Sequence, residues 1–162
     1  MSDIMILDLG KIAGNCTVTG YAGKILVDSF SAGSTMPLQV DTANSERTTG
    51  RPVISDWNFT KMSDISSTDI ESYHLMGTPI PTAILYVGRI EGTTGTYMEM
   101  MKVTFTNVLI SSYQQSGGGG MPSDSFSINF SAITKEYAQQ LATGAKKGVS
   151  AYSYDKSTLK AS

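Results

Sequence analysis

Strict alternation of apolar and polar residues along several short segments constrains the fold more than any other feature of this sequence. Met101, Val103 and Phe105 would point one way and the residues between them the other. Residues 56–60 and 126–132 show the same alternation. Because successive side chains of a strand point to opposite faces, this pattern predicts strands of an antiparallel sheet with one face buried.

Other segments are apolar on both faces, and one core cannot bury them completely. Tyr86 and Val87, for example, are adjacent and cannot both point inward. Their second faces need cover from a second sheet, a helix or a neighbouring subunit. With turn residues between the segments, we expect a sandwich or barrel in one domain spanning residues 1–162. The segments are residues 4–9, 24–30, 82–89 and 149–154.

One short helix is predicted at about residues 66–77. Thr68 and Glu71 have the spacing of a capping box, which marks a helix start, and Gly77 followed by Pro79 marks a stop. The rest of the chain reads as strands and connecting loops.

Two long stretches lack any regular pattern, and we expect them to be loops. Residues 34–52 are rich in small polar residues and contain two prolines, and residues 114–124 contain four consecutive glycines. No Gly-Lys-Ser/Thr follows those glycines, so a flexible loop is favoured over a phosphate-binding one. Loops this long in a compact domain are usually functional or disordered.

Charge is sparse and evenly distributed. The chain has 12 basic and 14 acidic residues, a net charge of −2, and charged residues make up 16% of it. The basic residues form no cluster, which argues against a nucleic-acid partner. The low charge fits either a β domain rich in Ser and Thr or a surface partly buried in an oligomer.

Most catalytic and metal sites are excluded by counting. The chain has one histidine, His74, and one cysteine, Cys16, so a thiolate–imidazole zinc site and most catalytic triads are impossible. We expect His74 to be structural and Cys16 to be a small buried residue. Asp64, Asp69 and Glu71 are close in sequence, but helix capping explains Asp69 and Glu71 better than calcium does. We therefore predict no enzyme activity, no metal and no cofactor.

Three ordered segments resemble the haemolysin-coregulated protein (Hcp) family, whose members form the inner tube of the type VI secretion machine. Residues 59–67 (FTKMSDISS) resemble the family's stretch before the helix, and residues 104–114 and 125–130 resemble the strands around its glycine-rich loop. Residues 25–33 and 82–87 match more weakly. The chain departs from the family at Thr68, at Tyr154 and over residues 138–147.

The resemblance implies a compact β-barrel of two antiparallel sheets with one flanking helix. It implies homohexameric rings that stack into a tube in the bacterial cytoplasm, with sheath, spike and effector proteins as further partners. The N-terminus has no signal-peptide pattern and no apolar run is long enough to span a membrane, so we expect secretion without a signal peptide and no membrane insertion.

The resemblance also suggests where contacts would lie. The stretch 34–52 resembles the family's extended loop, which reaches toward neighbouring subunits and the next ring, and Ser31 would lie near the lumen wall, where effectors are held or chaperoned. The loop residues that we expect in these contacts are Met36, Leu38, Val40, Arg47 and Arg51.

Two alternative functions remain at this point. A phage tail-tube subunit could share the barrel and the ring. A carbohydrate-binding β-sandwich could use Tyr86, Tyr97 and Tyr113 as stacking surfaces.

Overall fold

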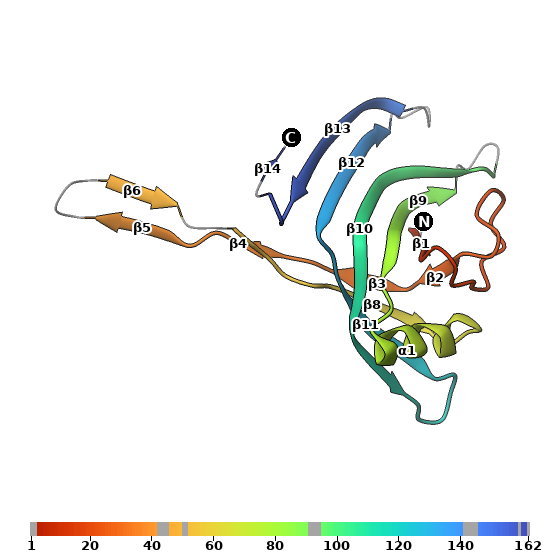
Figure 1. Cartoon of the computed structure of the whole chain (residues 1–162). Helices are drawn as coiled ribbons and strands as arrows, with labels where there is room; N and C mark the ends of the chain where they lie inside the picture. The colour runs from red at the N-terminus through yellow and green to blue at the C-terminus, as the bar shows by residue number, and fades with distance from the viewer. Residues whose placement is uncertain are drawn as a thin grey trace.

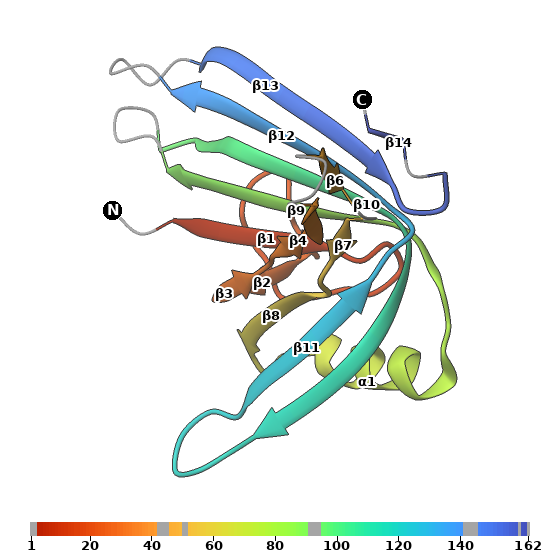
Figure 2. The same ribbon diagram turned by 90° about the vertical axis from the view of Figure 1, so that its left-hand side faces the viewer.

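Two antiparallel β-sheets face each other across one hydrophobic core in the computed structural model, and a single short helix packs beside them (Figures 1 and 2). The structure describes residues 3–41, 46–49, 52–90, 95–140, 146–158 and 160–161. It describes side chains for residues 3–37, 52–90, 95–138 and 150–158.

The sheets differ in width. The large sheet contains, in order, β2 (Ile25–Val27), β1 (Ile4–Asp8), β9 (Ile80–Ile90), β10 (Tyr97–Ser116), β12 (Ala132–Gln140), β13 (Lys146–Asp155) and β14 (Lys160–Ala161). The small sheet contains β3 (Ser29–Ser31), β8 (Trp57–Met62), β11 (Ser123–Asn129) and the C-terminal half of β10.

The chain joins the sheets at two corners. At one corner β2 leads into β3 through Asp28, whose backbone N–H donates to the Thr60 carbonyl at 2.8 Å. At the other, β10 bends near Asn107, which has a positive φ of 53°, and pairs with β12 before the bend and β11 after it. Backbone pairing therefore runs round the core, and this confirms the predicted compact β-barrel of two antiparallel sheets.

Alternating residues of the strands fill the core. In β8, Trp57 and Phe59 are buried while Asn58 between them is exposed. Trp57 meets Phe105 edge to face at 5.1 Å between ring centroids, a favoured aromatic geometry. Phe105 in turn contacts Phe130 at 5.0 Å. The predicted period-two segments are thus the inner walls of the barrel.

Part of the second apolar face of the large sheet is covered by the chain itself. The segment between β1 and β2 lies over the outer face, where Tyr21 packs edge to face on Tyr86 and on Tyr97, each at 5.0 Å. Tyr21 also donates a hydrogen bond to Glu99, and burial followed by this bond raises the pKa of Tyr21. Cys16 is buried in the same segment, as predicted.

The two stretches predicted as long loops are largely hairpins. Within 34–52 the structure places β4 (Ser34–Thr35), β5 (Leu38–Asp41) and β6 (Glu46–Thr49), and β4 pairs with β7 (Val53–Ile54). Within 114–124, β10 extends to Ser116 and β11 begins at Ser123. The sequence does not mark these strands because β4 and β6 are polar throughout, and the alternation in β5, Leu38 and Val40 against Gln39 and Asp41, is only four residues long.

The helix α1 spans Ser66–Met76, close to the predicted range, but the predicted capping box is wrong. The helix begins before Thr68, and the Asp64 carboxylate accepts a hydrogen bond from the Ser66 backbone N–H at 2.8 Å. Gly77, in the left-handed conformation at φ 64°, ends the helix as predicted.

A fully buried lysine joins the helix to the small sheet. Lys61 and Asp124 are register partners on β8 and β11, both have no exposed surface, and their side chains form an ion pair at 3.0 Å. The Lys61 ammonium also donates to Asp64 at 2.9 Å and to Ser67 at 3.1 Å. Since Ser67 lies in the first turn of α1 and donates to Asp124, one cation holds three elements together.

The two carboxyls respond to this surrounding in the same way. Burial acts to raise the pKa of Asp124, but hydrogen bonds, led by that from Ser67, and the ion pair with Lys61 outweigh it and hold the pKa below its ordinary value. Burial also acts to raise the pKa of Asp64, but its hydrogen bonds with Ser66 and its ion pair with Lys61 outweigh this effect and lower the pKa. Both side chains are therefore charged in the folded protein at neutral pH.

Removing one carboxylate should destabilise the barrel strongly. We expect Asp124→Asn to lower the free energy of unfolding by about 3 kcal/mol, because it leaves the buried Lys61 with an incomplete set of negative partners. Asp8→Asn is the matched control, since Asp8 and Lys24 form a partly exposed pair at 2.6 Å, and it should cost about 1 kcal/mol or less. Urea denaturation followed by circular dichroism measures both, and equal losses would contradict the role given to Lys61.

The same cluster predicts acid sensitivity. A carboxyl whose pKa is lowered by folding adds stability above its unfolded pKa, about 4 for Asp, and this stability is lost as the pH falls through the folded value. The free energy of unfolding should therefore decline below about pH 4. Asp124→Asn should flatten this decline, and equally steep pH profiles for the variant and the parent protein would argue against it.

Candidate assembly surfaces

A two-stranded arm projects from the barrel and is its most prominent outer feature (Figure 1). It continues the β3–β8 hairpin: β4 pairs with β7 at its root, and β5 pairs with β6 farther out. The register slips by one residue before each new pair, so the arm is a ribbon with two irregular joints. At the root, the Ser55 N–H donates to the Gly33 carbonyl at 2.9 Å.

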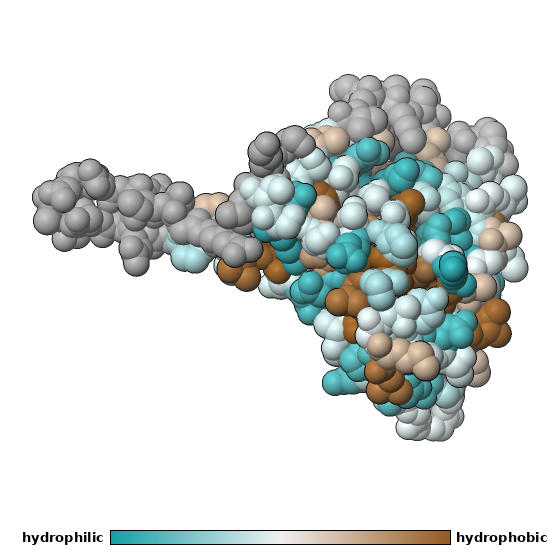
Figure 3. All heavy atoms as spheres, in the orientation of Figure 1, coloured by the Kyte–Doolittle hydropathy of each residue, from teal (hydrophilic) through white to brown (hydrophobic). Residues whose placement is uncertain are grey.

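The predicted contact residues fall on this arm where the structure describes them. Met36 follows β4 and is 48% exposed. Leu38 and Val40 lie in β5, and Arg47 lies opposite Val40 in β6, although the side chains of these three are outside the described part. Arg51 lies outside the described residues altogether. Figure 3 shows hydrophobic residues where the arm leaves the barrel, and Met36 and Val53 are exposed there.

The large sheet extends beyond the small one and leaves part of its inner face open. Lys135 pairs with Val103 on one side and Tyr152 on the other, so it shares the face that points into the core. Tyr152 itself is 48% exposed, and Tyr137, two residues farther along β12, is 50% exposed, although both lie on this inner face. We call this part of β12 and β13 the overhang.

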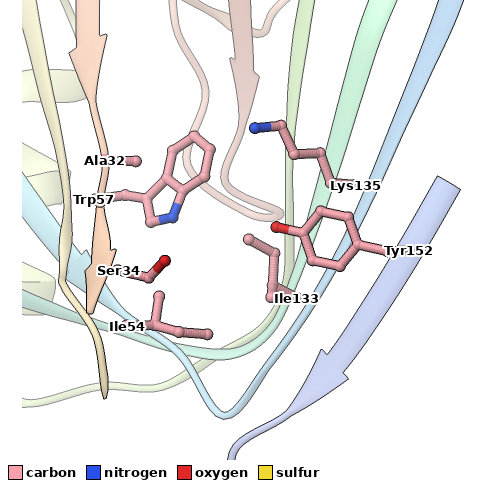
Figure 4. Close-up of a pocket in the computed structure, with 8 residues that line it drawn as sticks. Ala32, Ser34, Ile54, Trp57, Ile133, Lys135 and Tyr152 are labelled. Carbon is pink, nitrogen blue, oxygen red and sulfur yellow. The ribbon is translucent and has the colours of Figure 1, made fainter. Parts of the chain in front are cut away.

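A pocket of about 150 Å³ lies between the overhang and the root of the arm. Figure 4 shows Trp57 and Ser34 facing Tyr152 and Lys135 across it, with Ile133 at one side. The Lys135 ammonium lies 5.7 Å from the centre of the Trp57 ring, within the range of a cation–π contact. The remaining lining residues are Ala32, Gly33 and Ile54.

Ser31 lies on a different surface, the outer face of the small sheet. It pairs with Asn58, and both are exposed because their neighbours Phe30 and Phe59 point inward. Register partners carry this face across β8 to Ser125, opposite Thr60, on β11. Around Ser31 the face therefore carries small, uncharged polar side chains, and exposed Met62 lies farther along β8 on the same face.

The residues considered for chemistry serve the fold. Nδ1 of His74 lies 2.9 Å from the Ile110 carbonyl, which ties α1 to β10. Asp64 is engaged by Lys61, as described above. Among the described residues, no cluster of His, Cys, Asp and Glu side chains is suited to hold a metal ion. In the same part of the chain, no helix has the length and apolar character needed to cross a bilayer.

The tyrosines considered for carbohydrate binding do not form one platform. Tyr86 and Tyr97 both contact Tyr21 on the outer face of the large sheet, and the Tyr97 hydroxyl donates to the Ile4 carbonyl at 3.0 Å. Tyr113 instead packs against the core in the small sheet, with its hydroxyl buried.

Comparison with solved structures agrees with this architecture. A type six secretion system protein superposes with a TM-score of 0.90 and 24% identity, over 99% of this chain and 100% of that chain. Hcp1 from Salmonella typhimurium superposes with a TM-score of 0.80 and 20% sequence identity, over 99% of each chain. A type VI secretion system effector from Yersinia pestis superposes with a TM-score of 0.74 and 20% sequence identity, over 93% of this chain and 98% of that chain. No curated protein matches.

The family model described as "Type VI secretion system effector, Hcp" matches residues 6–137, which include the barrel strands from β1 into β12, the helix and the arm. This range contains the Lys61 cluster, the pocket residues up to Lys135 and the face that carries Ser31. The chain therefore belongs to the Hcp family of type VI secretion proteins.

Proposed function

We propose that this chain forms homohexameric rings that stack into the inner tube of a type VI secretion system, carry effector proteins and leave the cell with them. Membership of the Hcp family supports a tube subunit, and the exposed surface at the arm root and on the overhang is the observation that carries the ring. A ring of identical subunits needs two different, complementary patches on each copy. The arm root, where Met36 and Val53 are exposed, and the open inner face of the overhang are two such patches on one molecule.

The arm favours contact with another copy on energetic grounds. Isolated two-stranded hairpins are at best marginally stable in water, because they have no core to support them. Beyond β4 and β7, the β5–β6 pair has only its own pairing within the described part of the chain. Packing against a neighbouring barrel would supply the apolar cover that the arm lacks.

The overhang favours the same arrangement from the other side. Tyr137 and Tyr152 lie half exposed on a face whose other residues build the core. Large aromatic side chains gain most when they are fully buried, and they are enriched in protein interfaces. A neighbour seated on the overhang would complete the core at this edge of the barrel.

The polar face with Ser31 suits the carriage of effectors. Hydroxyl and amide side chains offer hydrogen bonds without fixed charge, so they can hold different proteins weakly and release them. The tube itself would act mechanically: a contracting sheath drives it outward behind a spike, and the subunit makes or breaks no covalent bond.

The first test is the mass of the protein in solution. Mass photometry should detect particles of six 17.3 kDa chains, and negative-stain images should show rings with a central opening. A strictly monomeric particle at high concentration would refute the proposal.

Shortening the arm should separate ring closure from stacking. We expect deletion of residues 38–49, which removes the β5–β6 pair and keeps β4–β7, to abolish tube growth while rings still form. Negative-stain microscopy with mass measurement distinguishes these states. Deletion of the glycines at 117–120, in the turn between β10 and β11, serves as the control for loop shortening. Tubes of full length from the arm deletion would show that this role is wrong.

Enlarging Ser31 should weaken the hold on effectors. Ser31→Gln places a longer side chain on the polar face and should reduce the amount of effector that co-purifies with rings by about threefold, because the added bulk keeps a bound protein from approaching this face. Ser72→Gln, an equal change on the exposed side of α1, is the control. Unchanged retention by Ser31→Gln rings would remove Ser31 from the effector surface.

A further inference from the structure

The pocket between the arm root and the overhang is lined with hydrogen-bond donors. Figure 4 shows the Trp57 indole and the Ser34 hydroxyl on one side of this space, the Tyr152 hydroxyl on the other, and the Lys135 ammonium reaching toward the Trp57 ring. The lining includes no Asp or Glu. We infer that the pocket binds the carboxylate of an acidic side chain from the arm of a second copy of this chain.

Lys135 is the centre of this argument. It occupies a core-facing position in β12, where Ile133 before it is buried. Among the described residues it forms no ion pair, and its contact is with the Trp57 ring. A partly covered ammonium gains more from an added carboxylate than an exposed one, because screening by water is weaker there. Lys61 differs from Lys135 in this respect, because it already forms ion pairs with Asp64 and Asp124.

The remaining groups suit a carboxylate better than another ligand. An ionised carboxylate has two oxygens that only accept hydrogen bonds, and the pocket offers hydroxyl and indole donors beside the ammonium. The pocket volume of about 150 Å³ is several times the roughly 10–15 Å³ that one water molecule needs, which leaves room for the end of an Asp or Glu side chain.

The arm supplies the acid. Asp41 in β5 and Glu46 in β6 are register partners at the outer end of the described arm, so two acidic residues share that end. Figure 1 shows this end far from the barrel, while the pocket lies at the root. The arm cannot fold back onto its own pocket without losing its strands, so the carboxylate comes from another copy. This contact rests on the proposed stacking of rings, and it identifies the charged groups that would hold two stacked copies together.

Charge reversal tests the contact. Lys135→Glu and, separately, Asp41→Lys with Glu46→Lys should each raise the concentration at which half of the chains are assembled by at least about tenfold, because like charges then meet. The chain carrying all three changes should recover most of this loss. Mass photometry over a dilution series measures it, and circular dichroism confirms that each variant is folded.

Two further variants keep the test specific. Lys11→Glu makes the same charge change at an exposed position and should assemble like the parent chain. Tyr152→Phe removes only a hydroxyl and should weaken assembly by about twofold to tenfold.

If the folded Lys135→Glu variant assembles normally, or if the triple variant does not recover assembly, the contact is wrong. The proposed function is unaffected by either result as long as the parent chain forms rings. A parent chain that never assembles would overturn both proposals.

Discussion

The unequal width of the two sheets determines what this molecule can do with its surface. The small sheet covers only part of the large one, so the strands β12 and β13 continue past the core with a face designed for burial. On that face the buried residues end at Ile133, and Lys135, Tyr137 and Tyr152 beyond it are only partly covered. The arm leaves the barrel beside this overhang and creates the pocket between them. The overhang therefore keeps exposed aromatic surface that the described part of the chain does not cover.

A second constraint acts at the opposite part of the core, where Lys61 is buried. Its charge is tolerated only because Asp124, Asp64 and Ser67 converge on it from β11, from the turn before α1 and from α1 itself. The stretch 59–67, which resembles the Hcp family, thus has a physical meaning: it contains the lysine, the acid and the serine that fasten the helix to the barrel. The motif therefore has a structural role, which is to join the helix to the small sheet.

The sequence predicts the barrel walls well because burial imposes a period of two, as in Trp57 and Phe59. It predicts the arm poorly because a ribbon in solvent has no buried face to leave a pattern. The capping box at Thr68 misled because the helix begins before it, at Ser66, whose backbone N–H donates to the Asp64 carboxylate. The pocket could not be assembled from sequence, since its residues come from distant segments. One signal was nevertheless present: Lys135 interrupts the apolar positions Ile133 and Tyr137.

The connectivity of the pocket has a consequence for the order of folding. The arm pairs residues close in sequence, whereas the pocket needs residues 32–57 to meet residues 133–152 and so closes a much longer loop. In the proposed contact, a chain can therefore receive an arm only after β12 and β13 have joined its barrel.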